Sequence, residues 1–487
     1  MTEKLEGLEA TADPSITKPA GESFYIVTFD GDDDSQNPLN WPRSRKWAMV
    51  GVLSSASLVA ILGTGMCIPP SSQILSSLKS HHEIFLTLLV SVWELGEACG
   101  PLFIGPLSEM YGRVPVYHTT NVLFTIFSIA CAVSRNIDML LAFRFLNGMG
   151  VAAISLNSSV VGDMFIQEER AGVQALINLP ALTGLAIAPL IGGYVGETLG
   201  WRWVFWLGAI VGGLCELGFI LFFRESYKVT ILEQKASKKR LATGDPKFRS
   251  IYASETKSSR QLFAEAIVRP AKILVLSPIV LVMSIYGAIV FGFQYLVMTT
   301  MTVVFEENYN MSEGTAGLMY LGRGIGSTIA ILACRFTMDR YIQKKKITPG
   351  GMKPEHRLPP MIIGSICMPL GFFLYGWSAE YKLPWIVPVL GTALIAGSLS
   401  VTNISLYSYL VDAFSIYAAS AVSACVVLSC IAAALLPMAG PSLYAHLGVG
   451  WGTSVLAFIS MAFIPVPIFL MRYGQRARSH SKFQVIE

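Results

Sequence analysis

Carboxylates and guanidinium groups occur inside long apolar stretches of this 487-residue chain. Glu94 and Glu97 lie three residues apart, so a helix would present both on one face. Arg144, Glu216 and Arg323 lie in three other apolar stretches. A charge in hydrocarbon normally faces the inside of a helix bundle and marks a pathway for ions or substrates. These five residues are therefore candidates for proton coupling.

Proton coupling needs a carboxylate that takes up a proton when it is buried and releases the proton near a cation. Glu97 is the best candidate for that carboxylate, and Arg144 is the cation expected to lower its proton affinity. Glu94, Glu216 and Arg323 are further candidates for the same role. The alternative for each residue is a static buried charge that only holds helices together.

Twelve apolar stretches position these charges. Apolar residues make up 53% of the chain and charged residues 14%, against roughly a quarter charged in soluble domains. Each stretch has the roughly 20 residues that a helix needs to cross a bilayer. The stretches are approximately 47–69, 85–107, 115–134, 139–162, 172–195, 202–223, 274–303, 314–334, 358–378, 385–410, 417–440 and 450–471. The sequence predicts an all-α membrane protein with twelve transmembrane helices in two pseudo-symmetric six-helix bundles.

Lysine and arginine set the expected orientation, because loops that stay in the cytosol are enriched in both. With cytosolic termini, only Lys79, Arg135, Arg202 and Lys382 among the 36 Lys and Arg residues would lie in outer loops. The reversed orientation would place the basic central loop outside. We therefore expect both termini in the cytosol.

Five segments follow from this layout. They are a cytosolic disordered tail (1–46), an N-terminal bundle (47–223), a cytosolic central loop (224–272), a C-terminal bundle (273–471) and a cytosolic tail (472–487). Part of the central loop, from about Ile231 to Leu241, has the composition of a basic helix that lies along the membrane surface.

Short repeats relate the two bundles. Glu109-Met-Tyr closes span 2 and Asp339-Arg-Tyr closes span 8. Asp163-Met-Phe closes span 4 and Asp412-Ala-Phe closes span 10. Internal symmetry of this kind is typical of transporters whose halves rock about a central site.

Several motifs together resemble one family. They are Gly105-Pro-Leu-Ser-Glu109-Met-Tyr-Gly112-Arg113 after span 2, Arg144-Phe-Leu-Asn147-Gly148 in span 4, Gly184-Leu-Ala-Ile-Ala188-Pro189-Leu-Ile-Gly192-Gly193 in span 5, and Arg224-Glu225-Ser226-Tyr227 after span 6. The chain resembles the major facilitator superfamily, in its fungal twelve-span drug:proton antiporter branch, over about residues 37–480. The span 5 run is similar to the antiporter signature of that branch, with Ala188 where glycine is usual.

The resemblance implies that the run ending at Arg113 is a conformational latch on the cytosolic side. Glu109 would face the positive end of span 11, near Tyr417, and Arg113 would pair with Asp163. Such contacts would hold the halves together and break in each cycle; simple surface charge is the alternative. The full set of expected latch residues is Gly105, Glu109, Gly112, Arg113, Asp163, Asp339, Arg340 and Asp412.

A substrate cavity lined by both halves is expected near the middle of the membrane. The polar and aromatic candidates for its lining are Asn157, Asn178, Tyr286, Gln294, Tyr295, Tyr375, Asn403 and Tyr407. An apolar wall with a few such groups suits bulky amphipathic molecules. Ordinary packing between helices is the alternative for each of them.

The function implied by the resemblance is secondary active export of a small amphipathic drug, toxin or secondary metabolite in exchange for protons. Proton-coupled or facilitative transport of polyamines or another nutrient is the alternative. The sequence lacks GxxxxGK[ST] and HExxH patterns, so we expect a proton gradient as the energy source, no cofactor, no metal and no enzyme activity.

The expected partners are the small-molecule substrate, protons and the lipid bilayer, with no nucleic acid, and the expected state is a monomer. The plasma membrane is the first expected location and the vacuolar membrane the second. Asn310-Met-Ser312 is a candidate N-glycosylation site in an outer loop.

Overall fold

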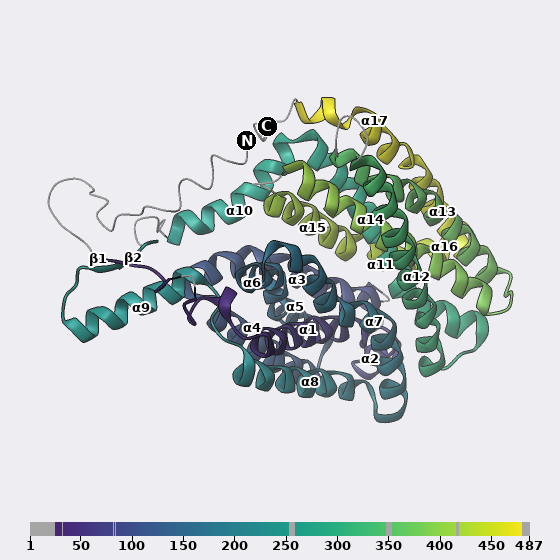
Figure 1. Cartoon of the computed structure of the whole chain (residues 1–487). Coiled ribbons are helices and arrows are strands. Elements are labelled where there is room, and N and C mark those ends of the chain that lie inside the picture. The colour runs from purple at the N-terminus through teal and green to yellow at the C-terminus, as the bar shows by residue number, and fades with distance from the viewer. Residues whose placement is uncertain are drawn as a thin grey trace.

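Figure 1 shows a computed structural model of the chain, whose described residues are 25–31, 33–80, 82, 84–252, 259–346, 353–414 and 418–479. Almost all of the described residues are helical. The helices form two bundles that lie side by side, with the first half of the chain in one bundle and the second half in the other.

The first bundle contains eight α-helices. They are α1 (Arg43–Gly65), α2 (Ser71–Ser77), α3 (Ile84–Tyr111), α4 (Arg113–Ala132), α5 (Ile137–Gly150), α6 (Asn157–Met164), α7 (Gln167–Leu199) and α8 (Trp201–Phe222). The 3-10 segment η2 (Ala152–Leu156) joins α5 to α6, so the three together form one crossing. Asn136 begins this crossing, because its side chain accepts a hydrogen bond from the Met139 N–H at 2.8 Å.

The second bundle is built in the same way. Its helices are α10 (Ser259–Leu276), α11 (Pro278–Tyr309), α12 (Glu313–Lys346), α13 (Pro359–Glu380), α14 (Ile386–Phe414), α15 (Ala418–Leu435), α16 (Gly440–Ala462) and α17 (Pro465–Ser479), with 3-10 segments η3 (Pro354–Arg357) and η5 (Leu436–Ala439). Proline begins α11 and α13, where its missing N–H has no intrahelical partner to lose.

The predicted twelve-helix membrane fold is confirmed. Ten helical stretches among the described residues are long and apolar enough to cross a membrane, and the last, Ser420–Gly474, is 55 residues long and so supplies two crossings. The helix α7, which has 33 residues, adds the remaining one. Most of these helices carry large apolar side chains on their outer surface, as lipid-facing helices do.

The boundary between spans 11 and 12 differs from the prediction. Span 11 continues past its predicted end at residue 440, from α15 through η5 into the first turns of α16, and the chain reverses at Gly448, inside the predicted loop between spans 11 and 12. Gly448 has φ +75°, which favours glycine. The Glu380 carboxylate then accepts the N–H groups of Val449 and Gly450 at 2.9 and 3.2 Å, so it caps the helix that follows.

The expectation of a disordered tail over 1–46 is wrong for its second part. The strand β1 (Tyr25–Val27) pairs in parallel with β2 (Phe248–Ser250) of the central loop, and η1 (Pro38–Asn40) precedes α1. Lys235 lies 2.7 Å from Asp30 and 3.0 Å from Asp34. Backbone N–H donors and Lys235 lower the pKa of Asp34 to about 2. We call these contacts the tail clamp.

Lys235 belongs to α9 (Lys228–Thr243), which covers the predicted basic helix at 231–241. In Figure 1, α9 and the two strands project from one end of the molecule, away from the bundles. That end also carries the turn between α3 and α4, since Arg113 and Val114 bond to Glu225 just before α9. Its loops are rich in Lys and Arg, so it is the end expected in the cytosol, and we call it the cytosolic end in that sense.

Candidate transport site and gates

A single glycine connects α3 to α4 on the cytosolic side. Gly112 has φ +93°, and the first two N–H groups of α4, from Arg113 and Val114, donate to the Glu225 carboxylate at 3.0 and 3.1 Å. Glu225 thus caps α4 with a negative charge. A Cβ on Gly112 would lie 2.5 Å from Glu225 Oε2, so only glycine fits this turn and this cap together.

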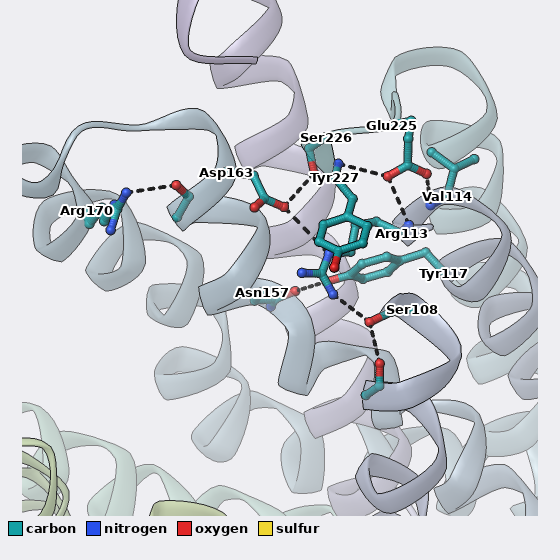
Figure 2. A network of polar contacts seen from close by, with 12 residues as sticks. Ser108, Arg113, Val114, Tyr117, Asn157, Asp163, Arg170, Glu225, Ser226 and Tyr227 are labelled. Atoms are coloured by element: carbon teal, nitrogen blue, oxygen red, sulfur yellow. Dashed lines mark hydrogen bonds and ion pairs between the residues drawn. The ribbon is translucent and has the colours of Figure 1, made fainter. Parts of the chain in front are cut away.

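Arg113 is the centre of the polar network drawn in Figure 2. Its Nε lies 3.6 Å from Asp163 Oδ2, its Nη1 donates to Ser108 Oγ, and its guanidinium lies 4.7 Å from the centre of the Tyr227 ring. The structure therefore contains the expected contact between Arg113 and Asp163. We call the set of Ser108, Arg113, Asp163, Glu225 and Tyr227 the N-half network.

The N-half network joins helices of one bundle only. Its members come from α3, α4, α6 and the segment after α8. Glu109 is exposed, and Tyr417 lies outside the described residues. The described contacts therefore join the helices of the first bundle at its cytosolic face. The expected contact between Glu109 and span 11 stays a prediction.

A second ion pair occupies the matching place in the other bundle. Arg357 Nε lies 2.8 Å from Asp412 Oδ2, and both side chains are between a quarter and a third exposed. Asp412 thus pairs with the residue just before span 9. Asp339 and Arg340 lie in α12, where their side chains fall outside the described ones.

The span 5 signature lies where the two bundles meet at the far end of α7. A Cβ on Gly193 would lie 2.5 Å from the Glu313 carbonyl oxygen of α12, and one on Gly192 would lie 2.0 Å from the Met66 carbonyl oxygen. Glycine thus permits backbone contact both within the first bundle and across to the second. Gly184 faces Ile61 of α1 in the same way.

The remaining signature residues fit the same packing. Pro189 contacts Gly65 of α1 and Gly317 of α12. A Cβ on Gly65 would lie 2.8 Å from Ala188 Cβ, so glycine on the neighbouring helix makes room for the alanine that departs from the family pattern. At the cytosolic end, by contrast, a Cβ on Gly105 would meet no other atom within 4 Å.

Glu94 joins the two bundles in the middle of the membrane-spanning part. It is 1% exposed, and its Oε1 accepts a hydrogen bond of 2.8 Å from the Tyr295 hydroxyl of α11. A proton-coupling candidate and a cavity candidate are therefore in contact. This bond is the only one between the intramembrane acids and the opposite bundle that the described residues make.

Glu97 and Arg144 do not form the expected pair. Arg144 donates to the carbonyl oxygens of Leu89 at 2.9 Å and Gly63 at 2.7 Å, and to Cys67 Sγ at 3.1 Å. These partners lie on α3 and α1, so the guanidinium links three helices of one bundle. The charge of Arg144 acts on Glu94, while Glu97 is half-buried one turn further along α3.

Glu216 lies away from the other acids. Its carboxylate oxygens lie 2.6 Å from His118 Nδ1 and 3.1 Å from Asn121 Nδ2, so it joins α8 to α4. The helices α4 and α8 pack against each other and against α5 and α1, and neither packs against α11 or α12. The structure thus favours the static alternative for Glu216.

Arg323 differs from every other candidate. It lies on α12 and is 5% exposed. Its Nη1 has no hydrogen-bond partner among the described residues, and neither does the hydroxyl of the predicted cavity residue Tyr375 on α13. Two buried side chains of the second bundle therefore carry donors that the described residues leave unpaired.

The other cavity candidates divide into packed and accessible residues. Asn157 is inside the first bundle, where it accepts from Tyr117 at 2.7 Å and donates to Ser57 at 3.2 Å, so its prediction as cavity lining is wrong. Tyr286 packs against Phe463 within the second bundle.

The remaining cavity candidates are not held by packing alone. The Oε1 of buried Gln294 has no partner among the described residues. Asn178 is exposed, while Asn403 and Tyr407 are half-buried.

The candidate glycosylation residue lies at a helix end. Asn310 follows α11 with φ +52° and is exposed. Asparagine tolerates this left-handed conformation better than most residues. Its modification stays a prediction.

Two functional residues were missed because their partners lie on distant segments. Glu225 caps α4 from the end of span 6, and the only sequence signal is its place in Arg224-Glu225-Ser226-Tyr227. Asn147 accepts from Trp93 Nε1 at 3.0 Å and donates to Ser128 Oγ at 2.8 Å, which ties α3, α4 and α5 together. Its proximity to Arg144 in the span 4 motif is the signal that could have found it.

Comparison with known proteins agrees with the fold. The sequence profile of the Major Facilitator Superfamily matches residues 53–437. The MFS-type transporter tndD of Aspergillus flavipes is 45% identical over 460 residues, which cover 93% of this chain and 85% of the relative. The efflux pump radE of Floropilus chiversii is 42% identical over 463 residues, covering 94% of this chain and 86% of the relative.

Solved structures are similar in fold alone. The crystal structure of a D-xylose-proton symporter has a TM-score of 0.66 at 15% identity, covering 90% of this chain and 98% of that one. A partially occluded inward open conformation of the xylose transporter XylE from E. coli has a TM-score of 0.64, also at 15% identity, covering 88% and 98%.

Proposed function

The chain belongs to the major facilitator superfamily, and on that premise we propose that it exports a small amphipathic molecule from the cytosol in exchange for protons. The export half of this proposal is supported by the 42% identity with a protein named as an efflux pump. A drug, a toxin or a secondary metabolite is the class of cargo. The plasma membrane is the proposed location, with the vacuolar membrane second.

The hydrogen bond between Tyr295 and Glu94 carries the proton half of the proposal. A hydroxyl donates more strongly to an ionised carboxylate than to a neutral carboxyl group. Because Tyr295 and Glu94 belong to different bundles, loss or gain of a proton on Glu94 changes how strongly the bundles hold each other. Glu94 therefore replaces Glu97 as the preferred proton carrier, with Glu97 one helical turn away.

Alternating access is supported by the unequal packing at the two ends. The backbones of α7 and α12 touch at Gly193 and Glu313, whereas Gly105 on the cytosolic side has free space beside it. This arrangement corresponds to a state closed towards the outside. A rocking motion that brings another helix against Gly105 would separate Gly193 from Glu313.

The test uses purified protein in liposomes with two amphipathic dyes of opposite charge, the cation rhodamine 6G and the anion fluorescein, and with a panel of fungal culture extracts. We expect uptake into acid-loaded, inside-out oriented vesicles to stop when a protonophore removes the gradient. Equal flux with and without the gradient would contradict proton exchange.

A variant separates the proton step from substrate binding. Glu94→Gln should lose the response to the gradient but keep exchange of labelled for unlabelled substrate, because the amide can still accept from Tyr295. Glu216→Gln is the matched control, since this buried acid lies between α4 and α8. Full gradient-driven export by Glu94→Gln would assign the proton to another group.

A further inference from the structure

Arg323 is a buried cation that the described part of the chain leaves without an acid. It is 5% exposed, and no carboxylate lies within ion-pair distance of it among the described residues. Its Nη1 lacks even a neutral hydrogen-bond partner there. A guanidinium group stays charged in proteins, so it cannot avoid this burial by losing its proton.

Arg144 shows how this protein satisfies a buried guanidinium when the charge is structural. Three groups of the surrounding helices accept its N–H donors, and two aromatic rings lie against its faces. Among the residues that the structure describes, Arg323 has no such set of acceptors or stacked rings. An unpaired charge in the membrane-spanning part of a protein strongly destabilises the folded state, and it is retained where a ligand or pathway needs it.

Tyr320 lies one turn from Arg323 on α12, and Tyr375 of α13 lies at the same depth, because Gly322 faces Val389 of α14 and Gly391 of α14 faces Tyr375. Tyr320 is held in place, because its hydroxyl donates to the Met298 carbonyl at 2.7 Å and contacts Thr302 Oγ1 at 3.0 Å. Tyr295 donates to Glu94. Tyr375 is fully buried, and its hydroxyl proton has no acceptor among the described residues.

Nη1 of Arg323 and the hydroxyl of Tyr375 are therefore donors that no described residue accepts from. Guanidinium matches a planar carboxylate with two parallel hydrogen bonds, and a tyrosine hydroxyl can add a third. A neutral or cationic ligand group would leave the charge of Arg323 unmatched. The complementary group is an oxyanion.

We propose that Arg323, assisted by Tyr375, is the subsite that binds an acidic group of the transported molecule. The cargo class is then amphipathic acids: compounds with a bulky apolar body and a carboxylate, or an enol or phenol that ionises near neutral pH. This inference rests on the proposed export function and adds the charge of the cargo. It also moves Arg323 from proton coupling to substrate recognition.

The test compares two probes that share one apolar body. Pyrenebutyrate carries a carboxylate at pH 7.5, and pyrenebutanol is uncharged at the same length. Binding to the purified full chain is measured by the protection of each probe from a water-soluble quencher. We expect wild-type protein to bind the acid at least tenfold more tightly than the alcohol.

Three variants locate that preference. Arg323→Gln should remove it by weakening binding of the acid about tenfold while leaving binding of the alcohol unchanged. Arg323→Lys keeps the positive charge but not the planar guanidinium group, and it should retain part of the preference for the acid. Arg202→Gln, a solvent-facing arginine of α8, is the control that should change nothing.

Tyr375→Phe removes a single hydroxyl group, and it provides a second test of the proposal if Arg323→Gln does not fold. It should weaken binding of the acid about threefold and leave binding of the alcohol unchanged. An unaltered preference for the acid in Arg323→Gln, or in Tyr375→Phe when the first variant is unfolded, would overturn the proposal. Equal binding of both probes by the wild-type protein would overturn it too.

The two proposals fail in different ways. If no compound shows gradient-driven export, the proposed function is wrong whatever the probes do. If export depends on the gradient but acids and their neutral analogues leave at equal rates in both wild type and Arg323→Gln, only the acidic-cargo inference is wrong.

Discussion

Among the described residues, each bundle buries one arginine inside its membrane-spanning part, Arg144 in the first and Arg323 in the second, and the surroundings of the two differ. The first bundle surrounds Arg144 with carbonyl, sulfur and aromatic partners from its own helices. The second bundle leaves Nη1 of Arg323 without a partner among the described residues. The same side chain thus has two uses. Arg144 has a structural role within its bundle, whereas Arg323 obtains a full set of partners only when a ligand is bound.

The repeat makes the comparison sharper. Arg323 precedes Asp339 by the same distance, to within one residue, as Glu94 precedes Glu109. Equivalent helices of the two halves thus carry an acid and a base at nearly the same depth. On the two proposals made above, divergence of the halves after duplication left the proton site on one half and the recognition of charge on the other.

Glutamine substitution of the two arginines is expected to give the largest contrast. Arg144→Gln leaves the Leu89 and Gly63 carbonyl oxygens without their donor, and each such buried group costs about 1–3 kcal/mol. Arg323→Gln removes an unmatched charge and should leave the melting temperature unchanged or raise it. Thermal unfolding in detergent measures both, and equal destabilisation of the two variants would erase the distinction.

Gly193→Val tests the contact between the bundles rather than either bundle alone. Its side chain would collide with the Glu313 backbone, so the outer ends could not close and transport should fall at least tenfold. The protein should remain folded. The control is Gly213→Val, because Gly213 of α8 has no neighbour within 4 Å. Labelling of an engineered cysteine near residue 313 from outside should increase only in Gly193→Val.

The contribution of each cytosolic ion pair to stability should follow the burial of the pair rather than its N–O distance. Arg113→Ala removes a 7% exposed guanidinium from the N-half network and should cost about 1–3 kcal/mol of stability. Arg357→Ala breaks the shorter but more exposed pair and should cost less than about 1 kcal/mol. Chemical denaturation measures the free energy of unfolding of both variants. A larger loss in Arg357→Ala than in Arg113→Ala would contradict this ranking.

Acid should release the tail clamp while leaving both bundles intact. The pKa of Asp34 is about 2 in the folded clamp and 3.8 in a free chain, so its contribution is fully present above about pH 4 and disappears as the pH falls towards 2. Asp34→Asn should mimic the acidic state at neutral pH. Limited proteolysis after Asp30 detects the release. Equal protection of the wild type at pH 5 and pH 2.5 would exclude this role.

Much of the fold could be predicted from composition and charge alone. Apolar length predicted the crossings, because it depends on the bilayer rather than on particular contacts. The orientation expected from the basic loops stays a prediction. The pairing of Arg113 with Asp163 came from the family motif. The helical turns of span 11 beyond residue 440 could not be predicted, since Pro441, Ser442 and His446 give that stretch the composition of a loop.

The partners of the intramembrane charges could not be predicted in the same way. Glu94 and Glu97 share a helix face, and only the rotation of α3 against α11 decides which of them meets Tyr295. Arg144 is matched by main-chain oxygens, which every sequence contains, so no side chain signals its partner. The tail clamp could not be predicted, because residues 25–34 contact residues more than 200 positions away in the sequence.

The parallel pairing of β1 with β2 also orders events on the ribosome. Residues 25–27 cannot pair with residues 248–250 until translation has passed residue 250. At about 5–20 residues per second, synthesis of the residues between the two strands takes on the order of ten seconds or more, and β1 stays unpaired during that time. The small sheet can therefore close only after the whole first bundle has been synthesised.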